Sequence, residues 1–303
     1  MSAELMLLES PHTPHLYGSC NGLLVFRERF PRTLYFVWNP LTGEKVYVRP
    51  PVHGSMVCGV FFHPLTKDYR LLFMYTEGRD FKFFIYSLGG QLWRKLDNFP
   101  YGPSALAPPT TLNGALHWMV QPFRINDKDD IPFYSSFVMI FNMDTEEFCS
   151  KPHPGKGCLS LSAHRDMFIF EMKGKLALYM LLDNLVVHVW VLEDYEKWVW
   201  GKRHSVWPHS DVERYPRNFD YGNSYISLVD IQNEELLFGW DFGGLFKYNL
   251  REKTVKQIYG VGIKQTCQDS QSCPFARSRL ERNSGRFFCV RYAKTFVSPS
   301  GFG

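Results

Sequence analysis

The sequence lacks the marks of a secreted, membrane-spanning or disulfide-stapled protein. Its first fourteen residues contain two glutamates and no basic residue ahead of an apolar core, so no secretory signal is predicted. The most apolar stretch, Leu176 to Leu192, is interrupted by Asp183, Asn184 and His188, which argues against a membrane span. The seven cysteines are odd in number and follow no regular spacing. We therefore expect free or buried thiols in a reducing compartment, and a soluble protein of the cytoplasm, the nucleus or both.

Neither sign of charge is in large excess. The chain has 34 Lys and Arg against 30 Asp and Glu, a formal net charge of +4. Between Arg277 and Lys294 six basic residues face a single acid, Glu281, so the excess is local. A nucleic-acid footprint over the whole chain is therefore absent, and we expect neither nucleic acid nor membrane as a partner. We interpret the basic segment as solvated, with a patch for an acidic partner as the alternative.

Motifs for catalysis and cofactor binding are also missing. There is no Gly-x-Ser-x-Gly nucleophile elbow, and Gly260-Val261-Gly262 does not continue into a phosphate-binding loop. We interpret His117 and His188, which lie in apparent strands, as packed strand residues. One group of soft and imidazole ligands within sixteen residues matches no zinc-finger spacing: Cys149, His153, Cys158 and His164. The sequence therefore predicts no catalytic residue, no metal site and no cofactor.

Aromatic residues are abundant, at 17% of the chain, and they follow a repeat. An apolar strand at 22–26, an aromatic strand at 34–38, a turn at 39–44 and a strand at 45–48 form the first unit. The aromatic strand with its turn returns, and the residues before the turn are Trp38, Tyr86, Phe141, Trp190 and Tyr248. Their steps are 48, 55, 49 and 58 residues. Short strands in repeats of this size predict a β-propeller with one blade per repeat.

The fold class we predict is all-β, a propeller of about five to six small antiparallel blades. Five repeats are recognisable, and a last strand at 286–297 is expected to complete a sheet begun at the other end of the chain. Asn21-Gly22 and Asn113-Gly114 are expected to be turns with positive φ. We also predict a turn at His63–Asp68 like the one after Asn39, and an outer strand at Lys197–Trp200.

Several phrases of the sequence resemble, in their order and spacing, the F-box-associated domain of plant F-box proteins. They are Gly18–Leu24, Trp38–Thr42, Asn113–Trp118, His188–Tyr195, Tyr248–Leu250 and Thr295–Pro299. The resemblance implies a short lead-in at 1–16, a kelch-like propeller domain at 17–299 and a tail at 300–303. It also implies a binding module, not an enzyme, that recruits a target protein to a cullin-based (SCF) ubiquitin ligase.

In that family an N-terminal F-box grips the adaptor subunit of the ligase. No F-box-like segment precedes residue 17 in this sequence, so we expect adaptor binding only if the full-length protein carries an F-box. One alternative is a stand-alone propeller without an F-box that competes for substrates. The other is a sugar-binding or enzymatic propeller, which would need acids, Tyr or His gathered at the mouth of the central channel.

Two long polar connections, Gln121–Tyr134 and Trp207–Asn223, are the expected places of contact with the unknown target protein. Connections of this length in compact domains are often functional. Exposed aromatic residues beside arginine are typical of the residues that dominate protein interfaces. The partner-binding residues that we predict are Arg124, Asp127, Trp207, Tyr215 and Arg217.

Overall fold

The computed structural model describes residues 15–28, 34–78, 80–103, 108–120, 137–154, 167–181, 187–206, 226–232, 235–240 and 244–259. Within these ranges the chain forms twenty strands and no helix. Accordingly, the described part contains no helix that is long and apolar enough to cross a membrane. The chain divides between Ser205 and Val206 into two compact units, and each unit is described by itself.

The first unit contains four sheets, each built from four consecutive antiparallel strands. Sheet 1 is β1 (His15–Cys20), β2 (Leu23–Glu28), β3 (Leu34–Trp38) and β4 (Lys45–Val48). Sheet 2 is β5 (Met56–His63), β6 (Asp68–Glu77), β7 (Asp80–Ser87) and β8 (Leu92–Lys95). Sheet 3 is β9 (Thr110–Leu112), β10 (Ala115–Met119), β11 (Phe137–Asn142) and β12 (Phe148–Pro152). Sheet 4 is β13 (Met167–Met172), β14 (Lys175–Leu181), β15 (Val187–Asp194) and β16 (Val199–Val206).

The second unit contributes sheet 5, which has the same antiparallel order. Its strands are β17 (Ile226–Gln232), β18 (Glu235–Trp240), β19 (Gly244–Asn249) and β20 (Thr254–Tyr259). The prediction of an all-β chain with five repeats of small antiparallel sheets is thereby confirmed. In the first repeat the structure adds one strand, β1, ahead of the three that were predicted. The predicted closing strand at 286–297, and with it any sixth blade, lies outside the described residues.

Apolar side chains fill the space between successive sheets of the first unit. Between sheets 1 and 2 the most buried are Leu23, Val25, Tyr35, Val37, Leu71 and Phe73. Between sheets 2 and 3 they are Phe61, Leu72, Phe83, Leu116, Met139 and Phe141. Between sheets 3 and 4 they are Val138, Met167, Leu176, Leu178 and Leu192. A small sheet cannot cover both of its faces alone, so each sheet depends on its neighbours for burial.

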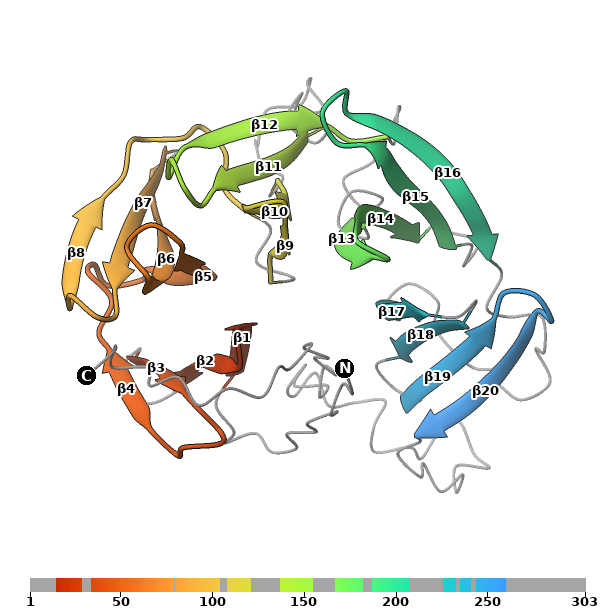
Figure 1. The fold of residues 1–303 in the computed structure, drawn as a ribbon, viewed down its shortest axis with the longest axis horizontal. Coiled ribbons are helices and arrows are strands. Elements are labelled where there is room, and N and C mark those ends of the chain that lie inside the picture. Colours follow the sequence, from red (N-terminus) through yellow and green to blue (C-terminus); the bar gives the residue numbers. More distant parts are fainter. Residues whose placement is uncertain are drawn as a thin grey trace, which may run out of the picture. The chain divides into compact units, whose positions relative to one another are not determined.

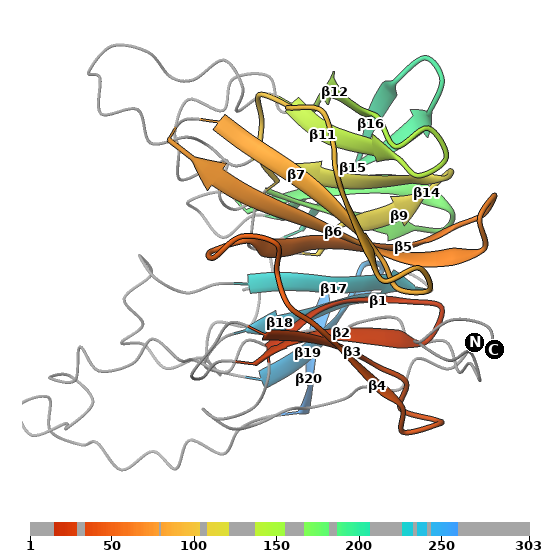
Figure 2. The same ribbon diagram turned by 90° about the vertical axis from the view of Figure 1, so that its left-hand side faces the viewer.

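Within each sheet of the first unit, the strands follow one another in chain order from the inside to the outside. Figure 1 shows β1, β5, β9 and β13 on the inner side and β4, β8, β12 and β16 on the outer side. Because the strands are antiparallel, the turns after the first and third strands of a sheet lie at one end. The remaining connections leave from the opposite end. Figure 2 shows the short turns of sheets 1 and 2 on its right-hand side.

The turn between the third and fourth strands has one design that recurs through the chain. Asn39, Asn142 and Asn249 each accept backbone N–H groups on Oδ1 at 2.8–3.0 Å. The residue four positions later closes the turn onto the asparagine carbonyl and has positive φ. Asparagine is suited to this place because its short side chain caps its own turn. The turn at His63 is similar, since the ring Nδ1 accepts from Thr66 N at 3.2 Å and Lys67 has φ 51°.

Two of our turn predictions are confirmed, and the strand predicted at Lys197–Trp200 is confirmed only from Val199 onward. Asn21-Gly22 and Asn113-Gly114 have positive φ at both positions, 47° and 84°, and 49° and 70°. In contrast, Trp198 does not lie in a strand. It occupies the closing position of the turn that starts at Asp194, with φ 56°, and β16 begins only at Val199.

The closing residue of this turn also connects neighbouring sheets. Glu146, on the turn of sheet 3, accepts from Arg70 of β6 and Arg94 of β8. Trp198, on the turn of sheet 4, donates its Nε1–H to Pro152 O of sheet 3 at 2.6 Å. At these two turns, the side chain of the closing residue thus reaches back to the preceding sheet.

Candidate interaction site

The five predicted contact residues all lie outside the described part of the chain. Arg124 and Asp127 belong to the connection between β10 and β11, and Trp207, Tyr215 and Arg217 to the connection between β16 and β17. The structure therefore leaves these residues as predictions. It does describe the base from which the first connection leaves.

The base of the β10–β11 connection is lined with aromatic side chains. Phe99 and Tyr101 lie edge to face with ring centroids 5.5 Å apart, and Tyr101 stacks on Phe137 at 6.1 Å. Phe99 also stacks on Phe148 of β12 at 5.2 Å. We call Phe99, Tyr101 and Phe137 the aromatic platform. All three are half-buried, so each ring packs on the core and still presents a surface.

The platform is held by the connector that follows β8. Phe99 forms a β-bridge with Phe81 of β7, and Pro103 forms one with Val120, directly after β10. Val120 is fully buried, and its N–H contacts Phe137 O at 3.5 Å. In the sequence this stretch is recognisable only as a Pro-rich connector between strands. The signal that we missed is the pair of aromatic residues, Phe99 and Tyr101, that it carries among its prolines.

Gly102 allows the connector to lie against sheet 2. A Cβ at this position would stand 2.6 Å from Phe81 Cδ1 and 2.8 Å from its Cζ, and closer still to Cε1. Phe81 is only 3% exposed and belongs to the core between sheets 2 and 3, so its ring has no room to move. Any side chain at residue 102 would therefore displace the platform or the core.

We expect Gly102→Ala to lower the free energy of unfolding by about 2–3 kcal/mol through overpacking. Gly18→Ala is the matched control, because its added Cβ would meet Val60 Cγ1 at an ordinary 3.5 Å. Urea unfolding of both variants and the parent chain measures the difference. Equal losses in the two variants would show that the connector is not tightly packed against Phe81.

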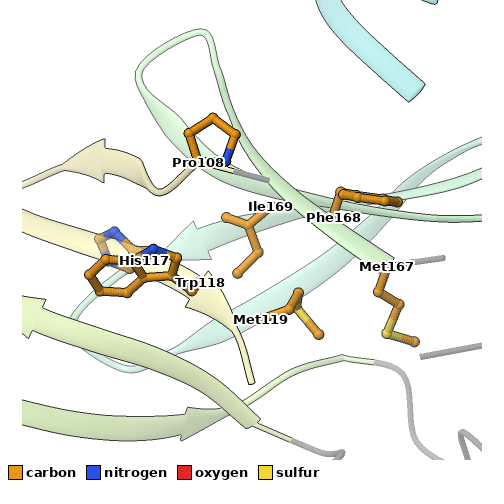
Figure 3. Close-up of a pocket in the computed structure, with 7 residues that line it drawn as sticks. All are labelled: Pro108, His117, Trp118, Met119, Met167, Phe168 and Ile169. Carbon is orange, nitrogen blue, oxygen red and sulfur yellow. The ribbon is translucent and has the colours of Figure 1, made fainter. Parts of the chain in front are cut away.

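A small cavity lies between sheets 3 and 4, beside β9, β10 and β13. Figure 3 shows its lining, which is mostly apolar: Pro108, His117, Trp118, Met119, Met167, Phe168 and Ile169. Its volume is about 10 Å³. That volume holds at most about one water molecule, whereas ligand pockets measure roughly 300–1,000 Å³. This cavity is therefore too small for a sugar or a cofactor.

His117, at the edge of this cavity, links two sheets. Its Nδ1 lies 3.1 Å from Thr110 O, and its Nε2 lies 2.8 Å from the Tyr195 hydroxyl. A carbonyl can only accept, so Nδ1 carries the hydrogen and Nε2 accepts from Tyr195. The side chain is 1% exposed, and burial lowers its pKa from 6.5 to about 4. The interpretation of His117 as a packed strand residue is confirmed, and its role is to connect sheets 3 and 4.

Comparison with known proteins identifies the family. A family model described as "F-box associated beta propeller domain" matches residues 3–277. The chain belongs to this family. The sheets described above are therefore blades of a β-propeller, as the resemblance implied.

Similar proteins in Arabidopsis thaliana carry F-box names. The F-box protein At3g07870 is 27% identical over 62% of this chain and 50% of its own length. The putative F-box protein At3g17480 is 24% identical over 73% of the chain and 58% of its own length. The F-box/kelch-repeat protein At3g23880 is 23% identical over 62% of the chain and 52% of its own length. The F-box-associated propeller thus spans about half the length of these relatives.

The thiols of the F-box-associated propeller that the structure describes are all free: Cys20, Cys58 and Cys149. Burial raises the pKa of Cys20 to about 11 and raises that of Cys58 further, so neither is a thiolate at neutral pH. Partial desolvation also raises the pKa of the Cys149 thiol, although that residue is exposed. Raised pKa values of this kind make these thiols poor nucleophiles.

The zinc-like grouping is described only in part, because Cys158 and His164 lie outside the described residues. Cys149 is exposed on β12, while His153 is 6% exposed, so the two lie in different surroundings. No cluster of three potential metal ligands occurs among the described residues of the propeller. His188, which we expected to be packed like His117, is only half-buried.

Proposed function

We propose that this F-box-associated propeller is the target-binding part of an F-box protein and delivers a target to a cullin-based ubiquitin ligase. The observation that carries the proposal is the family match over residues 3–277, together with relatives that are named F-box proteins. Binding of the ligase adaptor belongs to an F-box, which we place in the full-length protein. The target would be met in the cytoplasm or the nucleus.

The aromatic platform supports a binding role for the β10–β11 connection. Tyrosine and other aromatic residues supply much of the energy of protein interfaces when they are rigidly held. The platform supplies such rings at the base of the segment that carries Arg124 and Asp127. We propose that the platform and this segment contact the target together, with Trp207, Tyr215 and Arg217 as further contacts.

Crosslinking mass spectrometry in plant extract tests the proposal. The expected result is a recurrent protein partner whose crosslinks map to residues 121–136 or 207–225. The full-length protein, assembled with the adaptor, cullin and RING subunits and supplied with ubiquitin, activating and conjugating enzymes and ATP, should direct ubiquitination of that partner. A partner that binds but is never ubiquitinated would favour a competitor of degradation, and crosslinks confined to other surfaces would refute the assigned contacts.

Tyr101→Ala should weaken capture of the crosslinked partner at least about tenfold, because a lost hot-spot ring costs about 2 kcal/mol or more. Tyr101→Phe keeps the ring and should retain most of the affinity. Tyr47→Ala is the matched control, since Tyr47 is 52% exposed on β4 and lies outside the platform. Equal affinity of the Tyr101→Ala and Tyr47→Ala variants would exclude the platform from the interface. Thermal melts of each variant separate lost binding from lost folding.

A further inference from the structure

A cluster of polar and aromatic side chains lies at the outer edge of sheet 4. His188 Nδ1 is 2.9 Å from Ser205 Oγ, and His188 Nε2 is 3.5 Å from Lys202 Nζ. Trp190 adjoins both basic groups, with its ring 5.7 Å from Lys202 Nζ and 5.7 Å from the His188 ring. Lys202 and Ser205 are exposed, and His188 and Trp190 are half-buried. The cluster is therefore open to solvent on its polar side.

Within the described ranges, the positive charge of this cluster is not paired with an acid. Glu193, a carboxylate of the same strand β15, forms ion pairs with Lys175 at 3.0 Å and with Arg203 at 2.5 Å. Among the described residues, no carboxylate forms an ion pair with Lys202. Lys202 instead faces His188, and burial together with the Lys202 charge lowers the pKa of that imidazole. An added anion would supply the ion-pair partner that Lys202 lacks among the described residues.

The hydrogen bonds leave donors available for such an anion. Lys202 can only donate, so His188 Nε2 accepts from it and His188 Nδ1 donates to Ser205 Oγ. The Ser205 hydroxyl hydrogen is then free to point outward, beside the remaining ammonium hydrogens of Lys202. An oxyanion placed between them would replace the long 3.5 Å contact with shorter, charge-assisted hydrogen bonds.

The backbone beside the cluster can bind a polypeptide. β16 is the outermost strand of sheet 4 and has eight residues, Val199–Val206, with no acid among them (Figure 1). The free edge of an outer strand offers unpaired N–H and C=O groups to an added strand. A lysine on such an edge also discourages unwanted pairing of sheets. Lys95 on β8 is this simpler case, because among the described residues no His or Ser side chain is hydrogen-bonded to it.

We propose that an extended segment of the protein partner lies along β16 and places a phosphorylated or acidic side chain between Lys202, His188 and Ser205. This inference rests on the proposed function as a protein-binding module and names the chemistry that one of its surfaces recognises. Trp190 provides the apolar wall of the site. The negative charge of the segment complements an edge strand that carries Lys202 and Arg203.

The test uses the full chain and defined probes. Inorganic phosphate is titrated while the ¹⁵N signals of the His188 ring are followed, with His188→Asn used to assign them. Extended peptides with one central phosphoserine, glutamate or serine are then compared by fluorescence anisotropy. Phosphate should shift the His188 signals, and an anionic peptide should bind at least about tenfold tighter than the serine peptide. If both anionic peptides bind tightly, a carboxylate is sufficient for recognition by the site. If only the phosphoserine peptide binds tightly, the site recognises a phosphate group.

Lys202→Gln should abolish both the phosphate response and the preference for anionic peptides. Lys95→Gln, the matched change on another outer strand, should leave both intact. Equal loss in the two variants, or no preference for an anionic peptide in the parent chain, overturns the inference. The proposed function is judged separately: if the Lys202→Gln variant still captures the crosslinked partner at full strength, target binding stands and this site falls.

Discussion

Replacement of Glu146 by Gln is expected to lower the free energy of unfolding by about 3 kcal/mol. Glu146 accepts from both Arg70 and Arg94, and only 10% of its side chain and 14% of that of Arg70 are exposed. Removal of one partner of a largely buried ion pair is strongly destabilising. The carboxylate of Asp68, 3.7 Å from Arg70 Nε, lies beyond hydrogen-bond distance and compensates the remaining charge only in part. Burial already lowers the pKa of Arg70, and its Nε has no hydrogen-bond partner among the described residues. Urea unfolding monitored by near-UV circular dichroism measures the loss.

Asp80→Asn is the matched control for this charge removal, on sheet 2 itself. Asp80 lies 3.8 Å from Lys82 and its side chain is 73% exposed, so the change should cost less than about 1 kcal/mol. The double variant Glu146→Leu/Arg70→Leu removes both charges and should recover much of the lost stability. A double variant as unstable as Glu146→Gln would mean that the turn geometry, and not the unpaired charge, causes the effect.

The sequence predicts the local parts of this fold because their causes are local. The turns after Asn39 and His63 are specified by residues within five positions, where the first side chain caps the turn. The strands are specified by alternating apolar and aromatic side chains, and their recurrence predicts the number of described sheets. Trp198 was misplaced because Trp-Val-Trp alternates like a strand. The spacing of four from Asp194, which matches Asn142 to Glu146, was the signal that could have placed it.

The contacts between sheets are not predictable in the same way. Glu146 and Arg70 are 76 residues apart, and nothing near either residue shows that the pair is buried. His117 and Tyr195 are 78 residues apart and meet only because sheets 3 and 4 pack face to face. Likewise, the aromatic platform joins a connector to two strands. Such pairings depend on how blades stack, which one sequence does not encode in its local pattern.

The candidate site illustrates the same division between local and distant causes. Long polar connections between strands are visible in the sequence, and they led to Arg124 and Asp127. The rings beneath them come from residues on either side of sheet 3 and are brought together only by the fold. Ser205 and His188 likewise meet across the β15–β16 pair, although no sequence motif marks Ser205 as a site residue. Site residues that lie within one segment can therefore be predicted from the sequence, whereas sites that several segments form together cannot.

Acidification should destabilise the protein through His117. The folded pKa of about 4 lies below the ordinary value of 6.5 because burial disfavours the imidazolium. Between pH 6.5 and about 4, the His117 imidazole is therefore protonated in the unfolded chain but neutral in the folded chain. Neutral His117 contributes about 3 kcal/mol to the free energy of unfolding. This contribution is fully present above pH 6.5 and is lost as the pH falls toward 4. Protonation of Nε2 would also remove the acceptor for Tyr195.

The His117→Gln variant isolates this contribution from those of other titrating groups. Its free energy of unfolding, measured in urea from pH 7.5 to 4, should fall by about 3 kcal/mol less than that of the parent chain. Tyr195→Phe keeps the imidazole and removes only its hydrogen-bond donor, so it should lower stability by about 1 kcal/mol and leave the steep acid loss in place. Parallel pH curves for His117→Gln and the parent would mean that His117 has the same pKa in the folded and the unfolded protein. That result would contradict a neutral imidazole bound between Thr110 and Tyr195.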